Sequence, residues 1–158
     1  MAFIDLLGEI PHLEATEPLP SASNARPNGL LAYGGSLDSN YLLSALRSGI
    51  YPLSMPDKPT SWWSPCPRGV FFIKDVKISS RRRRKLAALE FETTINKHFS
   101  QVVSSCAECG ERRLKQWMSN KLQKSYVDLA EAELALSYEC HHEGFLVGGI
   151  FGVHVTNK

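Results

Sequence analysis

Proline is distributed unevenly along this chain, and its positions set the first limit on the fold. All nine prolines fall before residue 68, at Pro11, Pro18, Pro20, Pro27, Pro52, Pro56, Pro59, Pro65 and Pro67. Because proline lacks a backbone N–H and interrupts helix interiors, residues 1–28 and 51–69 cannot form long helices. A domain boundary is predicted near the second stretch, which divides the chain into residues 1–66 and 67–158.

The remaining segments carry periodic apolar patterns. Between the two proline-rich stretches, Ser36 or Asp38 is expected to cap a helix that Gly49 ends. After residue 69, continuous or alternating apolar residues predict strands, and apolar residues at helical spacing predict helices. The expected strands are 70–73, which should be buried on both faces, 91–95, 136–141 and 145–155, and the expected helices are 81–89, 99–106 and 122–135. This order predicts an α/β chain of the α+β type with mixed strand pairing.

Composition is that of a soluble globular protein. Hydrophobic residues make up 43% of the chain and charged residues 22%, which argues against disorder. The first residues lack the basic start of a secretory signal, and no apolar stretch approaches the ~20 residues that a membrane span requires. The four cysteines are therefore expected to be free thiols in a reducing cytoplasm, with no membrane partner.

Five consecutive cations form the strongest charge feature, although the formal net charge is only +2. They are Arg81, Arg82, Arg83, Arg84 and Lys85. Guanidinium groups offer forked donors that suit phosphate oxygens. The run indicates contact with a nucleic acid backbone, which gives affinity and register without reading sequence. The alternative is an ordinary solvated helix face.

Trp117 is a candidate for stacking on an unpaired base. It follows a polar stretch that contains Arg112, Arg113 and Lys115, and an aromatic ring beside cations is a common way to hold a base. The alternative is that Trp117 fills the core or a seam between domains. The same alternative applies to the pair Trp62-Trp63.

Cys106 and Cys109 form a single CxxC motif. With Cys140, His141 and His142 they could supply zinc ligands. The long gap and the lack of a second CxxC favour a buried Cys106 instead, with the two histidines near a hairpin turn. Neither a metal nor another cofactor is predicted.

Glycines interrupt the apolar strand at 146–153, most notably Gly148 and Gly149. Such glycines mark a bulge or a close approach of the backbone to a ligand, so the strand could offer main-chain groups to a substrate and wall an apolar pocket. The alternative is a core strand with glycines for tight packing. P-loop, GxGxxG, GxSxG and HExxH motifs are absent, so the sequence gives no sign of nucleotide hydrolysis or a covalent nucleophile.

Three segments, taken in order, resemble one protein family. PNGLLAYGG at 27–35 with GIYP at 49–52 looks like its N-terminal signature, WWSPCPR at 62–68 like its WWSPxPR motif, and LVGGIFGV at 146–153 like its LVGGxYGV strand. The resemblance covers about residues 19–155. The chain therefore resembles the leucyl/phenylalanyl-tRNA–protein transferases.

The resemblance implies a fold and an activity. The expected fold is a small N-terminal domain followed by an acetyltransferase-like (GNAT-like) catalytic domain. The expected activity is aminoacyl transfer of Leu or Phe, and less readily Met, from aminoacyl-tRNA to proteins with N-terminal Arg or Lys. Such transfer marks the acceptor for N-degron (N-end rule) proteolysis. The amino acid arrives as an activated ester, which agrees with the missing P-loop.

The resemblance also assigns roles to residues. It implies that Trp117 stacks on the terminal adenine, that Ile150 belongs to the pocket for the amino-acid side chain, and that Arg84 contacts the tRNA acceptor stem. The family pattern continues past the position of Val155, so the catalytic carboxylate is expected beyond Lys158. On this expectation the catalytic domain is incomplete, and the strand with Gly148 and Gly149 becomes an exposed sheet edge that promotes association.

Two other functions remain open. One is a non-catalytic descendant of the family that binds tRNA ends through Trp117 and the arginine run. The other is an N-acetyltransferase that uses acetyl-CoA. Such an enzyme usually carries a glycine-rich pyrophosphate loop after its central strand, and none is visible in this sequence.

Overall fold

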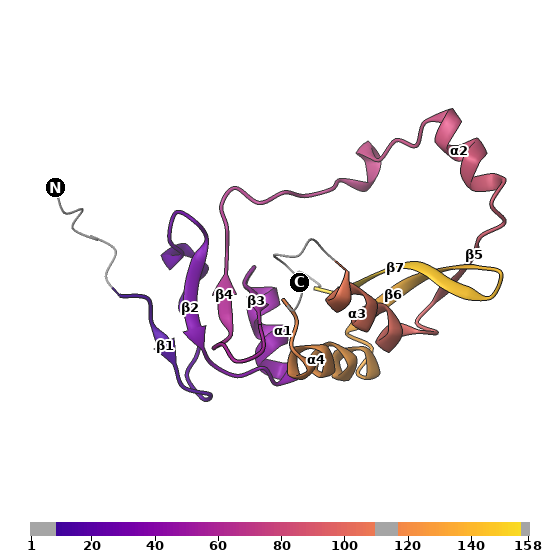
Figure 1. The fold of residues 1–158 in the computed structure, drawn as a ribbon. Helices are drawn as coiled ribbons and strands as arrows, with labels where there is room; N and C mark the ends of the chain where they lie inside the picture. The colour runs from indigo at the N-terminus through magenta and orange to yellow at the C-terminus, as the bar shows by residue number, and fades with distance from the viewer. Residues whose placement is uncertain (1–8, 110–116, 156–158) are drawn as a thin grey trace.

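The computed structural model describes residues 9–109 and 117–155, and its described part contains two β-sheets and four α-helices (Figure 1). The predicted mixed α/β class is therefore confirmed. The elements in chain order are β1 (His12–Leu13), a 3-10 turn (Ala22–Asn24), β2 (Leu30–Gly34), α1 (Ser39–Arg47), β3 (Tyr51–Leu53), β4 (Ser61–Trp63), a second 3-10 turn (Ile73–Asp75), α2 (Ser80–Ala87), β5 (Glu92–Ile95), α3 (Phe99–Glu108), α4 (Asn120–Glu131), β6 (Ala135–His142) and β7 (Phe145–Val153).

The first sheet has the strand order β1-β2-β4-β3, with β1 and β2 parallel and the other pairs antiparallel. Helix α1 follows β2 and is capped as predicted, because the Asp38 carboxylate accepts a hydrogen bond from the Tyr41 backbone N–H at 2.9 Å. Gly49 lies just beyond the helix with a φ of 76°, a left-handed conformation that glycine adopts without strain. The local signals in the sequence therefore gave both ends of α1.

The second sheet is antiparallel, with the order β5-β6-β7. Glu143 and Gly144 join β6 to β7 with φ angles of 51° and 79°, as a tight two-residue hairpin requires. The predicted turn is thus confirmed. Among the described strands, β7 pairs with β6 alone and so forms one edge of this sheet.

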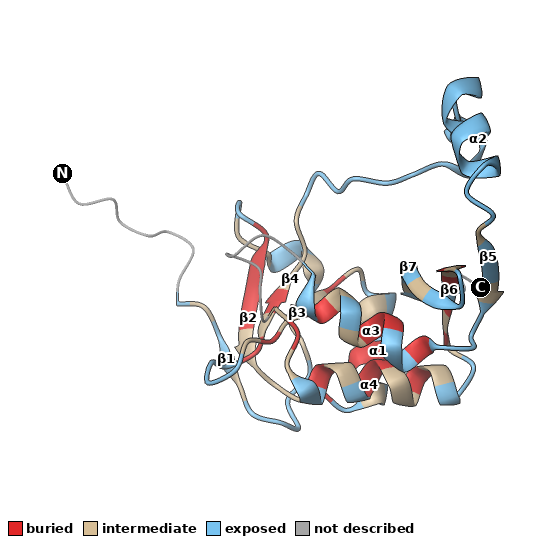
Figure 2. Cartoon of the chain, turned by 45° about the vertical axis from the view of Figure 1, so that its right-hand side comes forward, coloured by how far each residue is buried: buried red, intermediate tan, exposed pale blue. Residues whose placement is uncertain are grey.

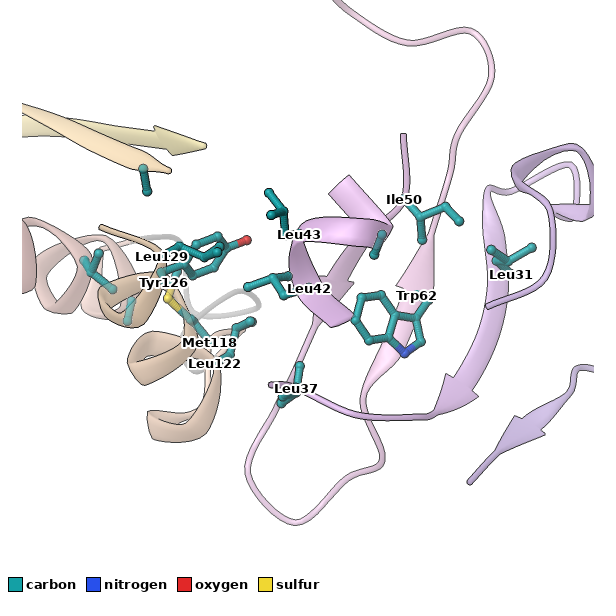
Figure 3. Packing of buried hydrophobic residues seen from close by; sticks show 14 of the residues in the cluster. Leu31, Leu37, Leu42, Leu43, Ile50, Trp62, Met118, Leu122, Tyr126 and Leu129 are labelled. Atoms are coloured by element: carbon teal, nitrogen blue, oxygen red, sulfur yellow. The ribbon is translucent and has the colours of Figure 1, made fainter. Parts of the chain in front are cut away.

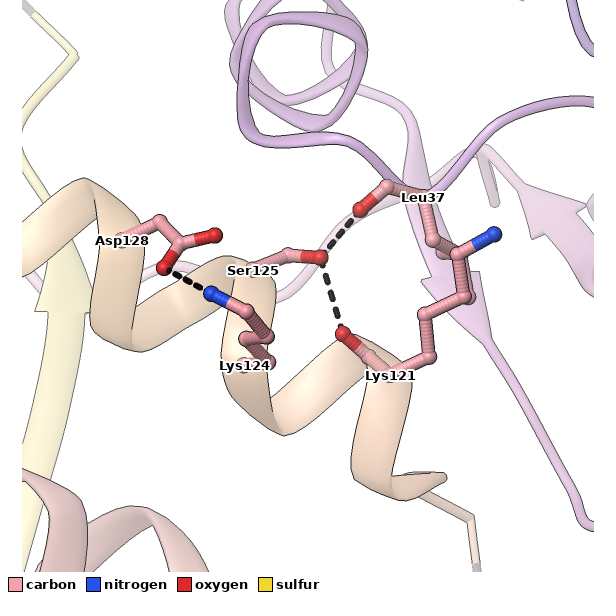
Figure 4. A network of polar contacts seen from close by, with 5 residues as sticks. All are labelled: Leu37, Lys121, Lys124, Ser125 and Asp128. Atoms are coloured by element: carbon pink, nitrogen blue, oxygen red, sulfur yellow. Dashed lines mark hydrogen bonds and ion pairs between the residues drawn. The ribbon is translucent and has the colours of Figure 1, made fainter.

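One hydrophobic core joins the two sheets (Figure 3). Helix α1 lies between the first sheet and α4. Its Leu42 belongs to one buried cluster with Trp62 of the first sheet and Leu122 of α4, and it lies between them. A buried hydroxyl adds a polar link, because Ser125 Oγ on α4 donates to the Leu37 carbonyl while also lying 2.9 Å from the Lys121 carbonyl (Figure 4). The predicted domain boundary at residue 66 stays a prediction.

The predicted buried strand at 70–73 is wrong. Phe71 is 96% exposed and Ile73 is 93% exposed, and Ile73 begins a 3-10 turn rather than continuing a strand. All residues from 66 to 90 are exposed, and the segment arcs away from the body to α2 (Figure 2). An apolar run becomes a buried strand only where a neighbouring strand can pair with it, and no described strand lies beside this one.

Candidate functional site

Trp117 is held at the junction of the two halves of the chain. Its indole Nε1–H donates to the carbonyl of Cys106, in the last turn of α3, at 3.2 Å. Its own carbonyl accepts from the Ser54 backbone N–H at 2.9 Å, just after β3. The ring is half-buried against the core. Trp117 is thus partly exposed, and hydrogen bonds hold both its ring and its backbone in place.

A hollow of about 380 Å³ lies beside the same turn of α3. Its walls are Val102, Ser105, Cys106, Cys109, Leu146, Val147, Gly148 and Gly149. Helix α3 therefore forms one wall and the edge strand β7 the other. Cys106 lines the hollow, and its carbonyl accepts the Trp117 hydrogen bond. The predicted glycines and the predicted tryptophan are therefore connected through α3, although Trp117 is not one of the residues that line the hollow.

Gly149 brings β7 against α3. A Cβ at this position would lie 2.8 Å from Val102 Cγ2 and 3.1 Å from Cγ1, closer than real side chains approach. A Cβ at Gly148 would meet only Cys140 Cβ, at 3.9 Å, which is ordinary contact. The two glycines therefore differ: Gly149 is needed for tight packing against α3, whereas a side chain at Gly148 would make only an ordinary contact with Cys140.

This difference gives a first prediction. Gly149→Ala should lower the free energy of unfolding by about 1–3 kcal/mol, because α3 must shift to admit the methyl group. Gly148→Ala is the matched control in the next position of the same strand, with an expected change within about 0.5 kcal/mol. Denaturant unfolding of both variants measures the effect. Equal losses in the two variants would contradict the packing argument.

Ile150 faces away from the hollow. It pairs with Tyr138 across the β6–β7 ladder and lies on the outer face of the sheet, where its side chain is 67% exposed. Ile95 on β5 continues this row and is also exposed. Because successive side chains alternate between the two faces of a strand, Ile150 lies on the face opposite to the one that Gly149 turns toward α3.

The five cations of the arginine run all lie on the exposed helix α2. Ser79 caps α2, since its hydroxyl accepts from the Arg82 backbone N–H at 3.3 Å, and all five cations are exposed. Figure 2 shows α2 standing clear of the body. Within the described ranges the only ion pair joins Lys124 to Asp128, so the cations of α2 are not neutralised there. The cations Arg112, Arg113 and Lys115 lie outside the described residues.

Glu139 is a buried carboxylate that the sequence analysis did not single out. It is 1% exposed, and it accepts hydrogen bonds from Thr94 Oγ1 at 2.5 Å, from the Ser137 hydroxyl, and from the backbone N–H groups of Lys97 and His98 at 3.4 Å. Burial alone would raise the pKa of this carboxyl, but these hydrogen bonds lower it by more, so its pKa lies below the ordinary value.

The sequence of β6 did carry a signal for a buried Glu139, because buried and more exposed residues alternate along this strand. Ser137, Glu139 and His141 share the buried face of the strand, while the apolar Leu136 and Tyr138 point the other way. Glu139 lies opposite Gly149 in the ladder and binds the backbone of Lys97 and His98, the two residues that lead into α3.

Other candidate sites stand apart from this one. A larger hollow of about 530 Å³ lies between residues 16–22 and α1, away from Trp117. Among the residues that the structure describes, no group of three or more His, Cys, Asp or Glu side chains is placed to hold a metal ion. None of the described helices is long and apolar enough to cross a membrane.

The comparisons with known proteins agree with one another. A family model for leucyl/phenylalanyl-tRNA protein transferase matches residues 70–158, more than half of the chain. A curated relative from Methylococcus capsulatus is 39% identical over 136 residues, or 86% of this chain and 58% of the relative. One from Aromatoleum aromaticum is 38% identical over 146 residues, or 91% and 62%. One from Yersinia pestis is 40% identical over 138 residues, or 87% and 58%.

All three relatives bear the name leucyl/phenylalanyl-tRNA–protein transferase. These matches place the chain in the class of proteins named tRNA–protein transferases. More narrowly, the chain belongs to the leucyl/phenylalanyl-tRNA–protein transferase family. It spans about three fifths of the length of the curated relatives that it matches.

Proposed function

We propose that this chain binds the aminoacylated end of tRNA and takes part in transfer of Leu or Phe, and less readily Met, to proteins with N-terminal Arg or Lys. Such transfer would take place in the cytoplasm and mark the acceptor for N-degron proteolysis. The observation that carries the proposal is the fixing of Trp117 to Cys106, a residue that also lines the hollow of β7 and α3.

The chemistry is acyl transfer. A neutral acceptor amine attacks the ester carbonyl, a tetrahedral intermediate forms, and the terminal ribose hydroxyl leaves. The protein must hold the terminal adenosine and the aminoacyl group in one geometry, which lowers the entropic barrier to the attack. The domain that does so is proposed to be acetyltransferase-like and to begin near residue 67.

Each predicted residue has a place in this scheme. The Trp117 ring stacks on the terminal adenine, and the backbone at Gly148 and Gly149 approaches the substrate without side chains in the way. Ile150 contributes to the apolar surface for the amino-acid side chain. Since Ile150 lies across the β7 edge from the hollow, the bound aminoacyl end would wrap around that edge.

The test is transfer of labelled Leu and Phe from charged tRNA to a protein with N-terminal Arg or Lys, with an N-terminal Ala protein as the control. Label on the Arg and Lys acceptors alone would support transfer. Binding of charged tRNA without transfer would overturn the catalytic part and leave a tRNA-end-binding protein. Neither binding nor transfer would overturn the whole proposal.

A Trp117 variant sharpens this test. Trp117→Ala should weaken binding of an aminoacylated acceptor-stem hairpin by about 1–3 kcal/mol, the contribution of one stacked base. Trp117→Phe is the matched control, because it keeps an aromatic face but cannot donate to the Cys106 carbonyl. Titration of the hairpin against both variants measures the difference. Equal losses for Phe and Ala would mean that the hydrogen bond, rather than stacking, determines binding.

Helix α2 is proposed to contact the acceptor stem through its cations. Replacing Arg81, Arg84 and Lys85 by Ala should weaken tRNA binding and lower the slope of log affinity against log salt by roughly 2–3, since each phosphate contact contributes about 0.7–0.9. Thermal stability should not change, because all three side chains are exposed.

The matched control for α2 is a triple alanine variant of exposed lysines on the body, Lys58, Lys121 and Lys124. It removes the same number of positive charges from a different surface. A salt-dependent binding series on both triple variants separates a local contact from a general effect of net charge. The same slope in both variants would argue against α2 as the phosphate-binding surface.

A further inference from the structure

Two thiols lie at the hollow, and the proposed transfer reaction uses neither of them. Cys106 is half-buried in the last turn of α3, and Cys109 is exposed at the end of that helix. Both residues line the hollow. The CxxC motif of the sequence is therefore a pair of free thiols on one wall of the candidate site.

Cys109 directly follows Glu108, the last residue of α3, so its spacing from Cys106 is close to that of helical residues three apart. Helical residues three apart have Cβ atoms about 5–6 Å apart, whereas a disulfide needs about 3.5–4.5 Å, so a shift of roughly 1–2 Å would close the pair. Cys109 is already in an extended conformation, with φ −73° and ψ 135°. It holds to α3 by one hydrogen bond, from its N–H to the Ser105 carbonyl at 2.8 Å. The required movement is therefore confined to the helix end.

The two thiols are not equivalent. Burial and the neighbouring Cys109 raise the pKa of the Cys106 thiol, which makes its thiolate less readily formed. Cys109 is exposed to solvent and accessible to reagents. Cys109 is therefore the thiol that reacts first, and Cys106 is the thiol placed to react second.

We propose that Cys106 and Cys109 form a thiol–disulfide exchange site that accepts a low-molecular-weight disulfide such as glutathione disulfide. The Cys109 thiolate, having lost its proton to solvent, attacks one sulfur of the reagent and forms a mixed disulfide, and one glutathione thiolate leaves. The Cys106 thiol, on losing its proton, attacks the Cys109 sulfur and releases the second glutathione. Two protein thiols are oxidised to one disulfide, and one glutathione disulfide is reduced to two glutathione molecules.

Closure of this bond acts on the candidate site. The Cys106 carbonyl accepts the Trp117 indole N–H, so movement of the last turn of α3 moves the anchor of that ring. The same turn forms a wall of the hollow. Oxidation should therefore change the surroundings of Trp117, whether or not the chain transfers amino acids.

The experiment is incubation of the reduced, folded chain with glutathione disulfide, followed by intact-mass measurement and peptide mapping. Apart from any glutathione adduct at Cys66, the expected product has lost the mass of two hydrogen atoms, and the new bond maps to Cys106 and Cys109. Cys66 is an exposed cysteine outside the hollow, so it should yield only a glutathione adduct and serves as the internal control. Cys106→Ser should convert the Cys109 product into a persistent glutathione adduct.

Tryptophan fluorescence supplies a second readout. Oxidation should change the emission of the native chain, and the change should vanish in Cys106→Ser and in Trp117→Phe. Glutathione adducts at Cys109 and Cys66 alike, with no loss of two hydrogens, would overturn the proposal. A disulfide that maps to any other cysteine pair would overturn it as well. Because no tRNA is used, failure here leaves the proposed transfer function unaffected.

Discussion

Replacing Trp62 with alanine is expected to lower the free energy of unfolding by about 3–5 kcal/mol, the range for a large aromatic residue removed from a core. The Trp62 side chain is fully buried, and its Nε1–H donates to the Gly34 carbonyl at 2.8 Å. Its ring lies 5.4 Å from that of Tyr41. Alanine would leave a cavity between α1 and the first sheet, and an unpaired carbonyl inside it.

The adjacent Trp63 provides the control. It is half-buried, and its Nε1–H bonds to the hydroxyl of Ser61 at 2.9 Å on the same strand. Trp63→Ala should therefore destabilise the protein less, by about 1–2 kcal/mol, in proportion to the smaller apolar area it removes. Urea unfolding of both variants with a common slope gives the comparison. Equal losses in the free energy of unfolding would show that the deeper burial of Trp62 does not explain its contribution to stability.

The sequence predicted the elements whose causes are local. The cap at Asp38, the glycine at the end of α1 and the turn at Glu143-Gly144 each depend on the conformation of a few neighbouring residues. Helices α3 and α4 followed from apolar spacing alone, since each buries one face. For Trp62 and Trp63 the core alternative was the better one, because Trp62 is fully buried.

The sequence failed where a contact between distant residues decides the outcome. The apolar run at 70–73 has the composition of a buried strand, but strand formation depends on a partner that the run itself does not specify. The position of Trp117 is similar, because its fixing depends on Cys106 and Ser54, which lie on different elements. Glu139 was missed because its partners, the start of α3 and Thr94, are brought together only by the fold.

The glycine strand shows how one sequence pattern permits two interpretations, of which the structure tests only the packing one. Gly149 packs against Val102, as the interpretation of a tightly packed core strand predicts. Gly148 and Gly149 also line the hollow, where the other interpretation would place a ligand. Sequence alone could not say which residues of this strand face the core. The register of β7 on β6 shows it, because Gly149 faces α3 and Ile150 faces away from it.

Glu139 carries the second large prediction. Glu139→Gln should destabilise the protein by about 1.5–3 kcal/mol at neutral pH, because hydrogen bonds to a charged acceptor contribute that much and the new amide group faces N–H donors that it cannot satisfy. The exposed Glu92 on the neighbouring strand β5 is the matched control, and Glu92→Gln should change stability by less than about 0.5 kcal/mol. Urea unfolding across a pH series measures both.

The pH dependence follows from the direction of the pKa shift. The folded pKa of Glu139 lies below the ordinary value of about 4.3, so its contribution to stability is full above that value and is lost as pH falls through the folded pKa. The stability gap between the native chain and Glu139→Gln should therefore be widest near neutrality and shrink in acid. A gap that stayed constant down to strongly acidic pH would mean that Glu139 stabilises α3 through shape and not through charge.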